Sequence, residues 1–278
     1  MTRNTTLTVV ISLVIFCVAV VLAVYFRPTP SPDKHASIAI PSPVVDLTDN
    51  SVICEDLEVM EYHGETACSG CPSYTTMSEL VEPFTFSHGI DGSFSKPDTH
   101  QKLMDTFGCE PHSNSFGGAL LLESNNGQWQ RLYYQSGIRL NDCLSYRTEN
   151  LTELLVCNEI DIFQGQQFGL LSVLRITDKR IRRRVLLEWY ADEENGNAIR
   201  LENMMQSDIN HDEYHDLSLK ISIEGEFLTR LQEMNKDMKL DRGIEINFLY
   251  LDKKFTASER DQKLLRLMHK IIKPDFSN

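Results

Sequence analysis

The sequence predicts an α+β protein: an N-terminal transmembrane helix, then a disulfide-braced, mainly antiparallel β-rich extracytoplasmic domain with flanking helices. Three observations support this prediction. The chain begins with a long apolar run, it carries six further cysteines, and short segments of alternating apolar and polar residues fill its middle. With 278 residues and 41% hydrophobic side chains, the chain is long enough to bury a substantial core.

The apolar run spans residues 7–26 and contains no charged residue. As a helix it would be about 30 Å long, which is enough to cross the hydrocarbon core of a lipid bilayer. The alternative is a cleaved signal peptide cut after Ala23, although its apolar region would be unusually long. We expect an uncleaved single-pass anchor that contacts the bilayer, preceded by a short tail (1–6) and followed by a proline-rich linker (27–50).

The cysteines indicate an oxidising compartment. One of the seven lies in the apolar run, and the even number that remains predicts disulfides, as in the periplasm or at the cell surface. Residues 144–156 can leave and return as a hairpin, so Cys143 is predicted to pair with Cys157. The other four cysteines allow three pairings, which stay open: Cys54, Cys68, Cys71 and Cys109.

Cys68 and Cys71 also form a Cys-x-x-Cys motif, which gives an alternative function. Such a pair shuttles between dithiol and disulfide when it opens a helix, because the helix N-terminus stabilises a thiolate. A helix is predicted from about Ser73 to the residue before Pro83. The alternative is therefore a thiol–disulfide oxidoreductase, but structural disulfides are the simpler interpretation, and no catalytic residue is predicted.

The soluble part divides into a cysteine-rich subdomain (51–116) and a β-rich domain (117–278). In the first, a helix is predicted between Asp98 and Gly108. In the second, Asn-Asn-Gly at 125–127 predicts a hairpin turn. The predicted strands are 119–122, 129–134, 153–157, 169–176, 184–191, 199–204, 217–223 and 245–251. The predicted helices are 226–239 and 258–273.

Residues 208–216 carry the most specific chemical pattern in the chain. Oxygen-bearing side chains occupy positions 1, 3, 5 and 9 of this segment, directly before a predicted strand. Hard cations such as Ca²⁺ favour six to eight oxygen ligands, so the spacing predicts a calcium-binding loop. The alternative is a turn whose Asp and Asn side chains bond to their own backbone. The side-chain ligands of the predicted calcium site are Asp208, Asn210, Asp212 and Asp216.

This segment resembles the calcium loop of integrin-alpha-type FG-GAP repeats, whose pattern is Asp-x-Asp/Asn-x-Asp-Gly-x-x-Asp before a strand. The resemblance covers one copy of about ten residues and implies no propeller. It implies a backbone carbonyl ligand from Tyr214 in addition to the four side chains. The sequence departs from the pattern at Glu213, where the family has glycine. A left-handed backbone there would cost a non-glycine residue about 1 kcal/mol or slightly more.

The net charge is −13, from 40 acidic and 27 basic residues. This acidity argues against a nucleic-acid partner. One basic cluster, residues 179–184, leads into an apolar segment and is interpreted as the solvated start of a strand. Asn150, in the sequence Asn-Leu-Thr, is a glycosylation acceptor if the source is eukaryotic.

Together these features predict a membrane-anchored extracytoplasmic binding or assembly module with a structural Ca²⁺ loop and a protein partner. An accessory single-span subunit of a membrane complex is a further alternative.

Overall fold

We describe a computed structural model, which defines residues 50–77, 83–86, 89–114, 116–163, 166–235 and 240–273. The predicted anchor at 7–26 and nearly all of the predicted linker lie outside these residues. Within the defined ranges, no helix is both long and apolar enough to cross a bilayer. This corrects the predicted single-pass membrane architecture, which receives no support from the described part of the chain. The described residues form one compact unit.

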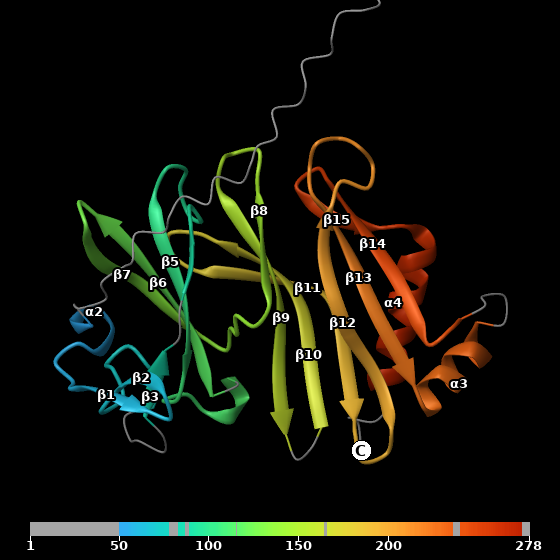
Figure 1. Ribbon diagram of the computed structural model, residues 1–278, viewed down its shortest axis with the longest axis horizontal. Helices are drawn as coiled ribbons and strands as arrows, with labels where there is room; N and C mark the ends of the chain where they lie inside the picture. Colours follow the sequence, from blue (N-terminus) through green and yellow to red (C-terminus); the bar gives the residue numbers. More distant parts are fainter. Residues whose placement is uncertain are drawn as a thin grey trace, which may run out of the picture. The chain divides into compact units, whose positions relative to one another are not determined.

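The predicted α+β class is also wrong, because the fold is mostly antiparallel β-sheet (Figure 1). Strands hold 53% of the described residues and helices only 14%. The largest local error is the predicted helix between Asp98 and Gly108, which is a strand. Residues 101–104 are all buried there, so both faces of this strand are covered. A strand buried on both faces loses the polar–apolar alternation by which a strand is recognised.

The first sheet is built from the N-terminal half of the described chain. Its strand order is β1-β2-β3-β5-β6-β7, with β4 pairing the same side of β5 as β3. The strands are β1 (Val59–Tyr62), β2 (Glu65–Cys68), β3 (Phe84–Phe86), β4 (Ile90–Gly92), β5 (His100–Phe107), β6 (Gly117–Asn125) and β7 (Gln128–Ser136). Two short helical turns accompany them, α2 (Ser51–Cys54) and η1 (His112–Asn114).

The predicted hairpin turn is confirmed between β6 and β7. Asn126 and Gly127 have φ values of 54° and 82°, the left-handed conformations that the tight hairpin turn requires.

The second sheet runs β15-β14-β13-β12-β11-β10-β9-β8, and every described neighbour is antiparallel. All six strands predicted between residues 153 and 251 are present. The sheet strands are β8 (Cys143–Arg147), β9 (Glu153–Phe163), β10 (Gln166–Ile176), β11 (Ile181–Asp192), β12 (Asn197–Ser207), β13 (Asp216–Glu224), β14 (Gly243–Leu251) and β15 (Lys254–Ala257). The strands β11 and β12 pair only through residues 190–192 and 197–199 and then diverge.

Two helices accompany the second sheet, as the sequence predicted. They are α3 (Glu226–Met234), where the described helix stops short of the predicted end, and α4 (Glu259–Ile272). The Ser258 side chain caps α4 by accepting a hydrogen bond from the Asp261 amide. The apolar face of α4 is buried, and this helix contacts β11, β15 and α3.

Two apolar cores hold the unit together. The larger lies within the second sheet and its helices, where β8 and β9 pack against β13, β14 and β15. The smaller joins the two sheets, with Leu103 and Leu121 on one side and Leu155 and Leu174 on the other. Two hydrogen bonds also connect the sheets, because the Gln135 side chain of β7 both donates to and accepts from the main chain of Ile181 in β11.

Candidate functional site: a basic hollow between two hairpins

The predicted calcium loop lies between β12 and β13 and is closed by its own hydrogen bonds. The Asp208 carboxylate accepts from the amides of Asp212 and Glu213 at 3.1 and 3.4 Å. The Asn210 side chain donates to the Asp212 carboxylate at 2.8 Å, and that carboxylate also accepts from the Tyr214 amide at 3.0 Å. The alternative to a calcium loop was a turn whose Asp and Asn side chains bond to their own backbone, and these are the hydrogen bonds that such a turn forms.

The fourth acidic position, Asp216, is fully buried and holds the loop to the sheet. Its two carboxylate oxygens accept from the amides of Ile209 at 2.9 Å and Tyr250 at 2.7 Å. Glu213, at the position that is glycine in the FG-GAP pattern, has a left-handed backbone in this chain, with a φ of 71°. Among the described residues, no group of three His, Cys, Asp or Glu side chains is placed to hold a metal ion. Binding of Ca²⁺ at this loop stays a prediction.

The described residues form three disulfides, and Cys143–Cys157 is the pair that the sequence predicted. These two cysteines face each other directly across β8 and β9. The other pairs are Cys54–Cys68 and Cys71–Cys109. The two cysteines of the Cys-x-x-Cys motif are therefore bonded to different partners, and Cys68 is fully buried. This arrangement does not provide the exposed dithiol pair that the oxidoreductase alternative requires.

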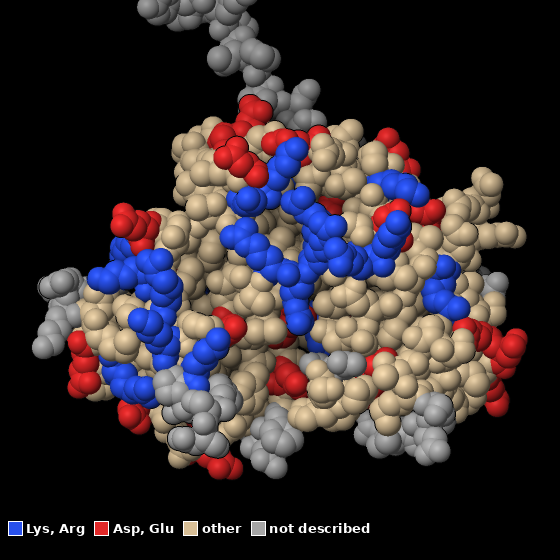
Figure 2. All heavy atoms as spheres, turned by 180° about the vertical axis from the view of Figure 1, so that it is seen from behind, with Lys and Arg blue, Asp and Glu red and all other residues tan. Residues whose placement is uncertain are grey.

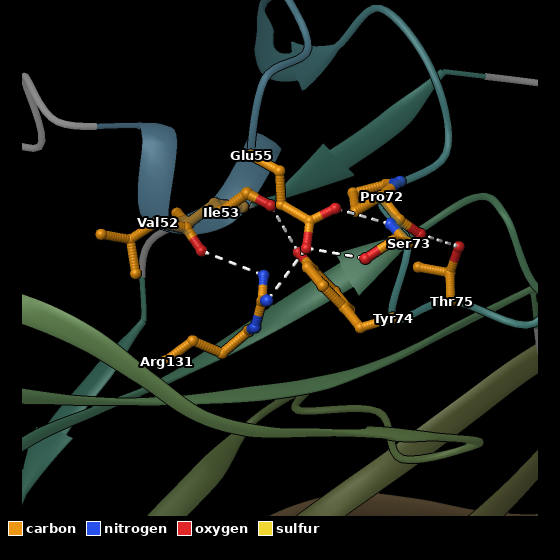
Figure 3. A network of polar contacts seen from close by, with 8 residues as sticks. All are labelled: Val52, Ile53, Glu55, Pro72, Ser73, Tyr74, Thr75 and Arg131. Atoms are coloured by element: carbon orange, nitrogen blue, oxygen red, sulfur yellow. Dashed lines mark hydrogen bonds and ion pairs between the residues drawn. The ribbon is translucent and has the colours of Figure 1, made fainter.

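A polar network around Glu55 holds the cysteine-rich segment against β7 (Figure 3). The Glu55 carboxylate accepts from the Ser73 amide and hydroxyl at 2.7 and 2.9 Å and pairs with Arg131 at 2.9 Å. The Arg131 guanidinium also lies 4.1 Å from the centre of the Tyr74 ring, whose hydroxyl donates to the Ile53 carbonyl. Because every central group is used within the network, we interpret it as a structural brace.

Asn150, the predicted glycosylation acceptor, is exposed in the turn between β8 and β9. The turn is closed by a bond from the Thr148 amide to the Thr152 carbonyl and by a contact between their hydroxyls. The side chain of Asn150 is thus accessible on a well-formed hairpin.

The sequence reasoning missed a cavity of about 430 Å³ that we call the basic hollow. It lies where the turn end of the β10–β11 hairpin meets the β14–β15 hairpin. Six Lys and Arg residues line it, together with three apolar residues and one acidic residue, Asp252. The basic lining residues are Arg175, Arg182, Arg183, Arg184, Lys253 and Lys254. All six are exposed, and Figure 2 shows Lys and Arg side chains gathered near the middle of this face.

Strand register concentrates the charge in the basic hollow. Arg175 of β10 is directly opposite Arg182 of β11, and Arg184 is opposite Val173. Because residues two apart on a strand share a face, the three arginines project from the same side of the hairpin. Like charges directly opposite each other on neighbouring strands destabilise a sheet. The fold therefore carries an unfavourable charge pair at this position.

Main-chain carbonyls hold two of these arginines in place. The Arg175 guanidinium donates to the Lys253 carbonyl, and the Arg184 guanidinium donates to the Phe255 carbonyl, both at 3.2 Å. These are neutral acceptors, so the charges remain uncompensated. Among the described residues, four basic side chains of the hollow form no ion pair: Arg175, Arg182, Arg184 and Lys254.

The other two basic side chains have carboxylate partners. Arg183 binds Glu159 at 3.1 Å, and Lys253 binds Glu149 at 3.3 Å.

A smaller cavity of about 200 Å³ adjoins the basic hollow and shares Arg175 and Lys253 with it. Tyr250 also lines this cavity, and its buried hydroxyl has no hydrogen-bond partner among the described residues. Burial raises the pKa of Tyr250, and the nearby Arg175 lowers it in part, so the hydroxyl stays protonated at neutral pH. This cavity thus offers the Arg175 guanidinium and an unused O–H donor, beside the carboxylates of Glu149 and Glu153.

Only part of this site was visible in the sequence. The cluster at 179–184 was recognised, but it was interpreted as the solvated start of a strand. Lys253 and Lys254 lie about 70 positions further along the chain, and no local pattern connects them with that cluster. The like-charge pair of Arg175 and Arg182 follows from the hairpin register. Aligning the two predicted strands in this register would have revealed the pair and indicated the site. No family model matches the sequence, and no curated protein or solved structure is significantly similar to it.

Proposed function

We propose that the protein is an extracytoplasmic binding module whose basic hollow binds the anionic groups of a ligand. The observation that carries this proposal is that six Lys and Arg residues line one cavity of about 430 Å³ in a chain with a net charge of −13, and that four of them form no ion pair among the described residues. The three disulfides support the extracytoplasmic location, since such bonds persist in oxidising compartments.

An anion would relieve a cost that the fold carries without it. Arg175 and Arg182 repel each other across the hairpin, and an anion between them would turn this repulsion into two attractions. Arginine suits this role because its planar guanidinium presents paired N–H donors to phosphate, sulfate or carboxylate oxygens. The carbonyls that already hold Arg175 and Arg184 reduce the entropy lost on binding.

The lining favours binding over catalysis. It supplies cations, an apolar floor from Leu154, Val173 and Phe255, and a single carboxylate. Its lining residues include no Ser, Thr, Cys or His that could act as a nucleophile or a neutral general base.

The test is calorimetric titration with inorganic pyrophosphate at low ionic strength. We expect the double variant Arg175→Gln/Arg182→Gln to bind at least tenfold more weakly than the wild type, a loss of about 1.4 kcal/mol. Raising the salt concentration should weaken wild-type binding, because screening acts on exposed charges. Arg242→Gln is the matched control, since Arg242 is exposed and lies at the opposite end of β14 from Lys253. Equal binding by all three proteins would contradict the proposal.

A further inference from the structure

A second cavity, which we call the α4 groove, is lined by the residues of β11 that follow those lining the basic hollow. It has a volume of about 370 Å³ and lies between β11 and α4. Arg184 is the last β11 residue that lines the hollow, and Val185 is the first that lines the groove. From Arg182 to Glu188 the strand extends about 20 Å. Figure 2 shows a second group of Lys and Arg side chains on the side of this face where α4 lies.

The α4 groove presents two more exposed cations. Arg266 and Lys270 are four residues apart, so they project from the same face of the helix. Neither forms an ion pair with another residue that the structure describes. The one carboxylate of the groove, Glu188, is already bonded to His269 at 2.8 Å. The α4 groove therefore adds two cations to those of the basic hollow, beside one carboxylate, Glu188, which His269 already contacts.

The floor of the α4 groove is apolar. Val185 is 40% exposed, and Leu186 and Leu265 line the cavity beside it. A ligand that follows β11 would thus meet cations at both ends of its path and apolar side chains between them.

We propose that the basic hollow and the α4 groove together bind one extended sulfated polysaccharide chain, an inference that rests on the proposed function above. Sulfate esters present several oxygens at regular intervals along such a chain, which suits guanidinium groups spread along a strand. The carbon–hydrogen faces of the sugar rings would lie against Val185 and Leu265.

Other polyanions fit the surface less well. Single-stranded nucleic acids bind by stacking bases on exposed aromatic rings, but Phe255, the one Phe, Tyr or Trp residue that lines either cavity, is 1% exposed. A flat anionic membrane would also face the acidic remainder of a molecule with a net charge of −13. An acidic peptide in extended form directs successive side chains to opposite sides, so half of its carboxylates would point away from the cations. A narrow sulfated chain avoids all three difficulties.

The experiment compares heparin-derived di-, tetra- and octasaccharides in calorimetric titrations with the wild type and two double variants. We expect the affinity of the wild type to rise at least tenfold from disaccharide to octasaccharide, because only the longer chain reaches both cavities. Arg266→Gln/Lys270→Gln should weaken octasaccharide binding at least fivefold and leave disaccharide binding unchanged. Arg175→Gln/Arg182→Gln should weaken both. Arg242→Gln and a desulfated octasaccharide serve as controls.

The outcomes separate this inference from the proposed function. The inference would be overturned if the three oligosaccharides bound with equal affinity and the octasaccharide bound equally well to Arg266→Gln/Lys270→Gln. This holds even if pyrophosphate still bound the basic hollow. Tighter binding of a poly-glutamate peptide of the same charge, or equal binding of the desulfated chain, would also overturn it. Failure of pyrophosphate and of all the oligosaccharides would refute the proposed function itself.

Discussion

At the scale of single residues, Glu55 shows how one carboxylate fixes a segment that has little core of its own. Burial by itself would raise the pKa of Glu55, but the hydrogen bonds from Ser73 and Arg131 outweigh this effect. The pKa therefore lies below its usual value of 4.5. A carboxylate whose pKa is lowered by folding stabilises the folded state above its unfolded pKa. It loses this contribution as the pH falls through the folded pKa.

We predict that Glu55→Gln lowers the free energy of unfolding by about 1 kcal/mol at pH 7, because it removes a charged partner from Ser73 and Arg131. The difference between wild type and variant should shrink as the pH falls below 4.5. Urea unfolding at a series of pH values measures both effects. Glu58→Gln is the control, since Glu58 is exposed nearby and its side chain has no partner among the described residues. A difference that does not change with pH would contradict the assignment.

At the scale of elements, the prediction to test is that the loop between β12 and β13 binds calcium. Because Asp216 and Asp208 already bind main-chain amides, the loop should stay folded in the presence of a chelator. At a calcium concentration ten times a millimolar Kd, binding would add roughly 1.4 kcal/mol of stability. We therefore predict that the Tm of the wild type rises by about 3–5 °C with Ca²⁺.

If the Tm of Asp208→Asn rises equally with Ca²⁺, or if the Tm of the wild type does not rise, this loop does not bind calcium. Asp56→Asn, an exposed position outside the loop, should retain the rise and serves as the control.

The elements themselves were predicted best where the information is local. The β6–β7 turn follows from Asn126 and Gly127, and α4 follows from its apolar period and the Ser258 cap. The strand β5 was mistaken for a helix because its burial depends on residues distant in sequence, such as Leu155 and Leu174, which share a core with Leu103. The basic hollow was missed for the same reason, since it requires Lys253 to meet Arg175 across the fold.

At the scale of the whole molecule, the disulfides differ in the length of chain that they close. Cys71–Cys109 joins residues 38 apart, whereas Cys143–Cys157 joins residues 14 apart. In the chain-entropy model the longer loop gives the larger stabilisation, about 4 kcal/mol against about 3 kcal/mol. The longer bond also connects a segment with little regular structure to the first sheet.

We predict that Cys71→Ser/Cys109→Ser destabilises the protein more than Cys143→Ser/Cys157→Ser does. Urea unfolding of the two double variants, each with its remaining disulfides intact, measures the difference directly from the midpoint and slope. The reverse order would show that strain or residual structure in the unfolded chain dominates over loop length.

The divergence of β11 from β12 affects the tendency of the protein to aggregate in solution. The Gln135 side chain bonds the main chain of Ile181, but residues 182–189 of β11 have no described strand partner on that side, and unpaired strand edges invite pairing between molecules. Three consecutive arginines, 182–184, lie in this stretch, and two of them, Arg182 and Arg184, have no ion pair among the described residues and would repel a second copy. Neutralising them by substitution or by a bound polyanion would weaken that repulsion, so aggregation must be monitored whenever the charge of this strand is altered.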